Sequence, residues 1–436
     1  MLHPWQARIR GADLVRRHGM VTRLRSTYVE ANGPAVPLGT LCRLIDPDGT
    51  RARLAQVIGV DRACITLAPF EDLAGTAPGG QVIALPTSHD VAVGDALLGR
   101  VIDPLGRPLD SGPAPAGKER GVLHAAGPAP LERASPRKVL ETGIRAIDGL
   151  LTLAHGQRVG IFAAAGVGKT SLMQQLAAQV DADRIVLALI GERGREVESI
   201  WSGIPAAVRR RTVLVAATSD QPAILRARAA DYAMALAEHW RTRGCHVLLL
   251  LDSVTRLAMA LREIGLAAGE PPTVRAYTPN VFAALPRLIE RAGALRAGGA
   301  ISAVLTVLAE TDDLDDPICE TLKSLLDGHF VLSRTLAEQG HFPAIDVSRS
   351  VSRQALAVTP GSARRDAQAI SAWLDAFEQS RTLRQAGLYA AGSDAQIDQA
   401  VARHAEIVAF LRQAPDQKVP LEETLADMRL VVEKAR

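Results

Sequence analysis

Residues 158–171 read RVGIFAAAGVGKTS, which is an apolar run, a loop of small residues and the start of a helical pattern. This order is typical of a phosphate-binding loop, in which backbone N–H groups wrap phosphate oxygens and the helix N-terminus adds partial positive charge. The match to G-x-x-x-x-G-K-[ST] departs at its first position, where Ala163 stands for glycine. The alternative is a glycine-rich strand-to-helix turn, which leaves the lysine and threonine unexplained. The stretch therefore predicts a nucleoside-triphosphate site.

Each residue type in this loop has a chemical role. We expect Lys169 to reach the β- and γ-phosphates as a compact positive charge, and the Thr170 hydroxyl to ligate Mg²⁺. The predicted cofactors are therefore ATP and Mg²⁺. The candidate nucleotide-binding residues of the loop are Ala165, Gly166, Val167, Gly168, Lys169, Thr170 and Ser171.

Two acidic residues follow apolar runs, where an open α/β sheet places its ligands. Glu192 comes just after residues 185–190, and its carboxylate could activate the water that attacks the γ-phosphate. Asp252 ends the run HVLLLLD and could hold the Mg²⁺ shell opposite Thr170. The alternatives are a helix-starting acid for Glu192 and a turn residue for Asp252, and the nearby phosphate loop favours the functional interpretation of both.

Other acidic residues have plainer interpretations. Glu196 and Glu198 lie further along and are assigned to a solvated helix face. In the stretch TDDLDDPICE, Asp316 followed by Pro317 fits a helix N-cap with proline at the first helical position, rather than a metal site.

Composition sets limits on the kind of protein. The 436 residues carry a net charge of +3, with 47% hydrophobic and only 3% aromatic residues, so charge alone does not predict nucleic-acid binding. The four cysteines form no CxxC pair, which argues against metal and disulfide frameworks. Residues 1–20 lack the apolar segment of a signal peptide, and no apolar run approaches the ~20 residues that span a bilayer. We expect a cytoplasmic protein that can associate peripherally with a membrane.

The composition and the pattern of apolar residues change along the amino-terminal part of the chain. Residues 1–20 are polar and basic, with a helix as one interpretation. Residues 21–98 carry short alternating segments cut by glycine, proline and aspartate, which predicts a small all-β unit, either a sandwich or a barrel. These segments are 53–60, 63–69 and 81–85. Residues 99–135 are rich in proline and glycine and indicate a connector on a surface.

The rest of the chain divides into two further regions that differ in their pattern of apolar residues. Between about residues 140 and 355, apolar runs alternate with helical patterns, which predicts a parallel sheet covered on both faces. The runs are 159–162, 185–190, 212–216, 247–251 and 301–308. After about residue 360 strand signals vanish, and three helices are expected at residues 367–384, 394–413 and 421–434.

Several motifs in one order carry a resemblance to a known family. They read AAAGVGKT, GERGREV, LLLLDSVTR, REIGLAAGEPP, LDGHFVLSRTLAEQGHFPAID and SVSR. In order and spacing they resemble the export ATPases of type III secretion systems, from injectisomes and flagella, which are similar to the catalytic subunit of rotary ATP synthases. The resemblance runs from about residue 20 to 430.

The resemblance implies a fold and a set of domains. It implies a P-loop, RecA-like α/β ATPase core with a parallel sheet, an N-terminal all-β barrel and a C-terminal helical bundle. The expected domains are a tail at 1–20 with a stator-binding role, an oligomerisation barrel at 21–98, an ATPase domain at 99–358 that includes the connector 99–135, and a helical domain at 359–436.

The resemblance also implies further site residues. Family members form homohexamers with ATP between subunits, and Arg353 in SVSR matches the arginine finger that one subunit offers to the next. Arg349 is a competing candidate, with a surface ion pair as its alternative role. Arg193 and Arg256 match arginines near the phosphates. Phe342 matches an adenine-stacking aromatic that is usually tyrosine, with an ordinary core aromatic as the alternative.

One departure from the family concerns the phosphate loop. Ala164 stands where family members usually have glycine. If this position needs a positive φ, alanine would strain the loop by about 1 kcal/mol or more and weaken nucleotide affinity.

The implied function is an ATP-hydrolysing homohexameric motor at the cytoplasmic base of a type III secretion apparatus, peripheral to the inner membrane. It would couple hydrolysis to chaperone release, unfolding and export of substrate proteins. The implied partners are stator and central-stalk proteins, the export gate and chaperone–substrate complexes. We also expect truncation at about residue 360 to leave nucleotide binding intact while it abolishes engagement of these complexes.

Three other functions are compatible with a phosphate-binding loop. A hexameric nucleic-acid translocase would need bases stacked on aromatics, and the first 98 residues hold only Trp5, Tyr28 and Phe70. A non-catalytic rotary subunit would lack the carboxylate that Glu192 supplies. A catalytic subunit of a rotary ATP synthase is a closer relative, against which GERGREV and REIGLAAGEPP favour export. Injectisome and flagellum both stay open, and the short amino terminus favours the injectisome.

Overall fold

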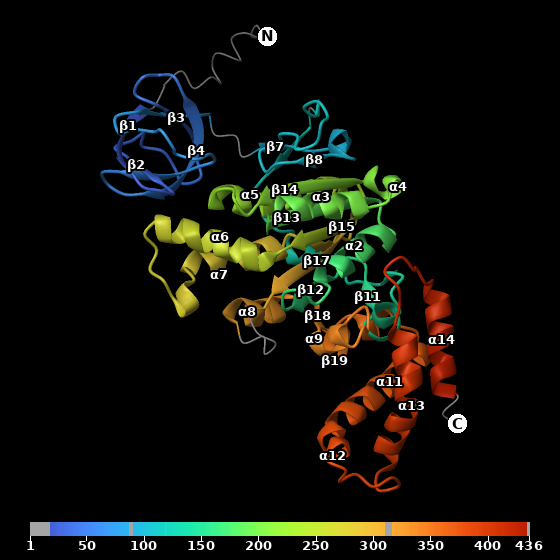
Figure 1. Cartoon of the computed structure of the whole chain (residues 1–436). Coiled ribbons are helices and arrows are strands. Elements are labelled where there is room, and N and C mark those ends of the chain that lie inside the picture. Colours follow the sequence, from blue (N-terminus) through green and yellow to red (C-terminus); the bar gives the residue numbers. More distant parts are fainter. Residues whose placement is uncertain (1–17, 87–89, 118, 310–315, 434–436) are drawn as a thin grey trace.

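The computed structural model describes residues 18–86, 90–117, 119–309 and 316–433. A small barrel lies at one end, an α/β core follows it, and a group of helices extends from the opposite end (Figure 1). The predicted tail falls mostly outside the described residues, and its last three residues, 18–20, begin the first strand of the barrel. The boundaries of the four domains given above stay predictions.

Six of the described strands close into the barrel in the order β1-β2-β5-β4-β3-β6. Their alternation points every second side chain inward, as at Ala55 and Val57, which are almost fully buried. Of the two all-β architectures left open above, the barrel is therefore the one formed. The strands are β1 (His18–Leu24), β2 (Val29–Ala31), β3 (Leu41–Ile45), β4 (Ala52–Val60), β5 (Ile65–Pro69) and β6 (Gln81–Ala84).

Nine of the described strands form the central sheet, in the order β19-β18-β12-β17-β15-β13-β14-β8 with β16 paired to β17. All five predicted runs are strands of it, and their pairings are parallel. The strands are β8 (Val101–Ile102), β12 (Arg158–Ala163), β13 (Arg184–Glu192), β14 (Thr212–Thr218), β15 (His246–Asp252), β16 (Gly293–Ala294), β17 (Ala300–Leu308), β18 (Gly328–Leu332) and β19 (Ile345–Ser352).

The sheet is not wholly parallel, because β19 runs antiparallel to β18 and β16 runs antiparallel to β17. Two two-stranded ribbons lie outside it and pair β7 with β9 and β10 with β11. These ribbon strands are β7 (Asp90–Ala92), β9 (Arg120–Val122), β10 (Val139–Leu140) and β11 (Leu153–Ala154).

Helices cover both faces of the sheet, as predicted. Alternate residues of β13 enter two different apolar clusters: Val186 belongs to the one that includes α5, α6 and α7, and Leu187 to the one that includes α2, α3 and the C-terminal helices. The helices of the core are α2 (Lys169–Gln179), α3 (Gly194–Gly203), α4 (Ala206–Arg209), α5 (Ala223–Arg241), α6 (Val254–Ala267), α7 (Pro279–Ile289), α8 (Pro317–Leu325), α9 (Arg334–Glu338) and α10 (Ala355–Val358).

The start of α8 confirms the plainer interpretation of the acidic stretch. The Asp316 carboxylate accepts a hydrogen bond from the Ile318 N–H at 2.8 Å, with Pro317 at the first helical position. Residues 311–315 of that stretch lie outside the described residues.

The C-terminal part is helical, as predicted, with one difference. The first helix begins at Gly361 and ends at Gln379, and a short separate helix follows it after Ser380. The helices are α11 (Gly361–Gln379), α12 (Arg381–Gln385), α13 (Ala395–Leu411) and α14 (Leu421–Glu433). Asp394 caps α13 through hydrogen bonds from two backbone N–H groups.

Two whole-chain features bear on the composition. In the described part of the chain, no helix has the length and apolar character needed to cross a membrane. The cysteines Cys42, Cys64, Cys245 and Cys319 are all free.

Candidate nucleotide site

The phosphate loop follows the last residue of β12 and runs into α2. Gly166 and Gly168 have φ angles of 81° and 99°, which glycine adopts without strain. Within the described residues, positive φ outside glycine occurs only at Arg275 and Ala276, so Ala164 is not in this region. The condition for strain at Ala164 is therefore not met. Ala165 and Gly166 are exposed at the turn, where their backbone is open to a ligand.

Lys169 lies between the two acidic residues that sequence analysis selected. Its ammonium donates a hydrogen bond to Asp252 Oδ1 and lies 3.8 Å from Glu192 Oε1. The three side chains are only 13%, 2% and 14% exposed. The strand ends of β13 and β15 and the first turn of α2 therefore bring one cation and two carboxylates together.

The pKa of Glu192 is raised to about 7, first by burial and then by the nearby charge of Asp252 and a hydrogen bond with Glu196, against the opposing charge of Lys169. A carboxylate with a pKa near neutrality can take up a proton at the pH where enzymes work. Its position at the end of a strand, 3.8 Å from the ammonium of Lys169, suits activation of a water molecule.

Of the two acidic residues that follow Glu192 on α3, one differs from the sequence-based interpretation. Glu196 was assigned to a solvated helix face, and this is wrong, because it is partly buried and bonded to Glu192. The first turn of α3 folds back toward the strand end, which brings the two carboxyl groups together. Glu198 does lie on the exposed face, where it accepts a hydrogen bond from Ser202 at 2.7 Å.

Sequence analysis missed Thr306, which lies on β17 between β12 and β15. Its hydroxyl donates to Asp252 Oδ1 at 2.6 Å and fixes the carboxylate that faces Lys169. Thr306 is fully buried, and a hydroxyl within the otherwise apolar run ISAVLTVL is the signal that could have found it.

The two predicted metal ligands lie on neighbouring elements. Thr170 is in the first turn of α2, and this helix packs against β15, whose last residue is Asp252. Within the described residues, no group of three or more His, Cys, Asp or Glu side chains could hold a metal ion. One hydroxyl and one carboxylate nevertheless fit Mg²⁺, which usually takes one or two carboxylates and completes its shell with phosphate and water.

The two arginines near the strand ends have different surroundings. Arg193 follows Glu192 directly and is exposed as the N-cap residue of α3. The side-chain carbons of Arg256 lie against Gly191, where an added Cβ would come within 3.1–3.4 Å of them. Among the described residues, Arg256 Nε is buried without a hydrogen-bond partner.

A cavity of about 220 Å³ lies beside the phosphate loop. Phe342 is 42% exposed in it, which excludes the alternative of an ordinary core aromatic. A Cβ on Gly168 would lie 3.7 Å from the Phe342 ring, so the ring sits next to the loop. The cavity is lined by Gly168, Ser171, Leu172, Gln175, Leu332, Phe342, Pro343, Ala344, Gln413 and Pro415.

The C-terminal part contributes to this cavity, which sequence analysis did not foresee. The Gln413 N–H donates to the Phe342 carbonyl at 2.8 Å, and its side chain donates to the Gly143 carbonyl at 2.6 Å. Truncation at about residue 360 removes this wall, so the structure argues against the expectation that truncation leaves nucleotide binding intact.

Arg353 lies at the opposite end of the strands from the phosphate loop. Its N–H donates to the Asp327 carbonyl at 2.9 Å, and the Asp327 N–H donates to the carbonyl of Arg158 at 2.8 Å. Arg158 is the first residue of β12, whereas the phosphate loop follows the last, and six residues of strand span about 20 Å. Arg353 is therefore remote from the phosphate loop of its own chain. Arg349 is exposed on β19, and its N–H donates to Asp346 Oδ1 at 3.2 Å.

Comparison with known proteins identifies the family. Residues 143–352 match the nucleotide-binding domain of the ATP synthase alpha/beta family, and residues 359–429 match the type III secretion EscN ATPase C-terminal domain. The chain is 46% identical over 421 residues to a type 3 secretion system ATPase of Xanthomonas euvesicatoria, covering 96% of this chain and 95% of the relative. The chain belongs to the family of type III secretion and flagellum-specific ATPases. It is an ATPase, and it binds nucleotide.

Other members of this ATPase family extend the match. The flagellum-specific ATP synthase of Salmonella typhimurium is 42% identical over 441 residues, covering 99% of this chain and 97% of the relative. A solved structure of the assembled ATPase EscN from the enteropathogenic E. coli type III secretion system superposes with a TM-score of 0.90 at 41% identity, covering 95% of this chain and 100% of that one. These matches confirm the predicted fold class and do not favour the nucleic-acid translocase or the rotary synthase.

Proposed function

We propose that this ATPase works as a homohexamer at the base of a type III secretion apparatus, of an injectisome or a flagellum. There it would couple ATP hydrolysis to chaperone release, unfolding and export of substrate proteins. The likeness to EscN in its assembled form supports a ring of subunits. A structure of EscN with its central stalk EscO, at a TM-score of 0.86 and 40% identity, supports a stalk protein as one partner.

Within one subunit, the roles follow from the geometry around Lys169. On ATP binding its ammonium exchanges Asp252 for phosphate oxygens, the loop N–H groups hold the remaining phosphate oxygens, and Glu192 takes a proton from the attacking water. Thr170 and the released Asp252 would hold Mg²⁺, which neutralises phosphate charge when bound. Phe342 would stack on the adenine, and Arg193 and Arg256 would lie near the phosphates.

The site is completed by a second subunit. Because Arg353 lies at the end of the strands opposite its own phosphate loop, its guanidinium is too far away to act at its own chain's nucleotide and would act at another chain's. This single observation carries the proposal of a ring in which each subunit offers its arginine to the next. The expected further partners are the stator, the export gate and chaperone–substrate complexes, with association at the inner membrane through the apparatus.

The proposal of Glu192 as the base is tested by Glu192→Gln, with Glu198→Gln as the matched control on an exposed face nearby. We expect Glu192→Gln to bind ATP near normally and to hydrolyse it at least ~100-fold more slowly, because the amide cannot accept the proton. Glu198→Gln should behave as the unmodified protein. If Glu192→Gln keeps most of its turnover, the base is misassigned and Glu196 is the next candidate.

A further inference from the structure

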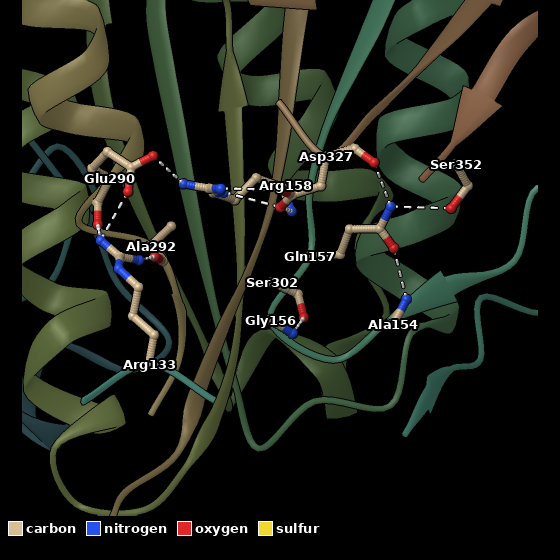
Figure 2. A network of polar contacts seen from close by, with 10 residues as sticks. All are labelled: Arg133, Ala154, Gly156, Gln157, Arg158, Glu290, Ala292, Ser302, Asp327 and Ser352. Atoms are coloured by element: carbon tan, nitrogen blue, oxygen red, sulfur yellow. Dashed lines mark hydrogen bonds and ion pairs between the residues drawn. The ribbon is translucent and has the colours of Figure 1, made fainter. Parts of the chain in front are cut away.

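A network of polar contacts, most of them partly buried, lies where β12 begins (Figure 2), and the backbone N–H of Arg353 joins it at the Asp327 carbonyl. We propose that Gln157 is a positioning residue for the arginine finger, since its buried carboxamide fixes the turn from which Arg353 projects toward the neighbouring subunit. This inference rests on the proposed function of Arg353.

The Gln157 carboxamide joins three segments of chain. Its Nε2 donates to the Asp327 carbonyl at 3.1 Å and to Ser352 Oγ at 3.0 Å, while its Oε1 accepts from the Ala154 N–H at 2.9 Å. The side chain is only 2% exposed; the bond from Ala154 is buried and the bonds to Asp327 and Ser352 are partly buried, and this shielding from water strengthens them.

These bonds act directly on the finger residue and the residue before it. The Asp327 carbonyl accepts from both Gln157 and the backbone N–H of Arg353. Ser352 in turn donates to the Thr152 carbonyl at 2.7 Å. The backbone that carries Arg353 is thus held on both sides, and its guanidinium reaches the Lys323 carbonyl at 3.1 Å in this single chain.

Charged residues anchor this network to the sheet. Arg158 donates to the Asp327 carboxylate from its backbone N–H, its Nε and its second terminal nitrogen, each at 3.0 Å. The other terminal nitrogen donates to Glu290 at 2.7 Å, and Glu290 lies 2.9 Å from Arg133 (Figure 2). Two arginines and two carboxylates balance one another, so the loop before β18 has a fixed place.

Fixing this turn matters because a finger stabilises charge on a phosphate of another subunit. A misplacement of about 1 Å can cost roughly 100-fold in rate, even when the responsible change is far from the chemistry. Loss of the Gln157 bonds in one subunit should therefore lower kcat at the site of the neighbour that receives its finger. The KM for ATP at the phosphate loop of the altered subunit should stay the same.

The test uses rings mixed from two inactive subunits, so that the finger and the phosphate loop can be altered separately. The reference mixture is Glu192→Gln with Arg353→Ala, in which the complete sites pair the phosphate loop of the second with the finger of the first. Gln157→Met, which keeps the size of the side chain and removes its hydrogen bonds, is then added to one partner or the other.

On the Glu192→Gln partner, which supplies the finger, Gln157→Met should lower the recovered activity at least about tenfold. On the Arg353→Ala partner, which supplies the phosphate loop, it should leave the recovered activity within about twofold, since that partner's finger is already absent. Equal losses in both mixtures, or a loss only with the second, would show that Gln157 supports the fold or its own phosphate loop and would overturn the proposal.

Two further variants keep the outcome decisive. Ser352→Ala removes one of the two acceptors of Gln157 and should lower activity about threefold, again only on the finger-supplying partner. It serves if Gln157→Met does not fold. Thr212→Val is the control, because the Thr212 hydroxyl is also fully buried and donates to a backbone carbonyl, at Val208 at 2.9 Å, away from both the cavity and the Gln157 contacts, and it should change neither mixture. A reference mixture without activity would instead reject the finger in trans, and this proposal with it.

Discussion

The two ends of the strands in the central sheet, which we call the phosphate edge and the finger edge, differ in how their charged groups are paired. At the phosphate edge, formed by the ends of β12, β13 and β15, one ammonium faces two carboxylates, and the pKa of Glu192 is raised to about 7. The finger edge is formed by residues 157–158, 327–328 and 352–353. There arginines and carboxylates pair with one another, and both the oxygen and the nitrogen of the buried Gln157 carboxamide have hydrogen-bond partners. The difference teaches that the first edge is built to exchange partners with a ligand and the second to hold one side chain still.

The largest effect is expected at the finger edge. Arg353→Ala should bind ATP near normally and lose roughly 10³-fold or more in hydrolysis, because arginine fingers contribute about 10³–10⁵ in rate. Steady-state ATPase assays across protein concentration measure this, and the specific activity of the unmodified chain should rise as rings form. Arg381→Ala removes an arginine of α12 that forms an exposed ion pair with Glu378 of α11, and it is the control. A larger loss in Arg349→Ala than in Arg353→Ala would move the finger to β19.

A smaller effect is expected from pH at the phosphate edge. Because Glu192 must be deprotonated to accept a proton and its pKa is about 7, kcat/KM should rise about tenfold per pH unit below 7 and level off above it. Glu196→Gln replaces the neighbouring carboxyl, whose hydrogen bond and charge help to raise this pKa, with an amide that can donate to the Glu192 carboxylate, so the rise should move to lower pH. A profile that is flat between pH 6 and 8 in the unmodified protein would contradict this assignment.

The smallest effect is expected in the cavity beside the loop. Phe342→Ala should weaken ATP binding about tenfold, since stacking of a base on an aromatic ring contributes about 1–3 kcal/mol. Phe342→Tyr keeps the ring and should bind as the unmodified protein does. Calorimetry with a non-hydrolysable ATP analogue measures both, and equal affinity of Phe342→Ala and the unmodified protein would show that the base lies elsewhere.

The two edges also differed in how far the sequence could predict them. The phosphate edge could be predicted because a glycine loop and acidic residues at the ends of apolar runs are visible within short stretches of sequence. Lys169, Glu192 and Asp252 do come together as expected. Their chemical roles stay predictions. Thr306 was missed because its hydroxyl lies inside an apolar run, where only its contact with Asp252 gives it a purpose.

The finger edge and the cavity depend on pairings between distant segments. The strands β18 and β19 were not predicted, since β18 is short and β19 is polar on its exposed side. The place of Gln413 against Phe342 joins two domains and has no local signature. The resemblance to a family supplied Arg353, but only the register of β18 and β19 shows that it lies opposite its own phosphate loop.

The central claim is that each nucleotide site takes its loop and base from one subunit and its finger from the next. The most direct measurement is the ATPase activity of rings mixed from Glu192→Gln and Arg353→Ala at varied ratios, with subunit exchange verified by native mass spectrometry. With independent sites in a head-to-tail ring, activity should be lowest for each variant alone and peak at equal amounts, at about one quarter of the unmodified rate. If exchange occurs and no ratio restores activity, Arg353 does not act across the interface and the account is wrong.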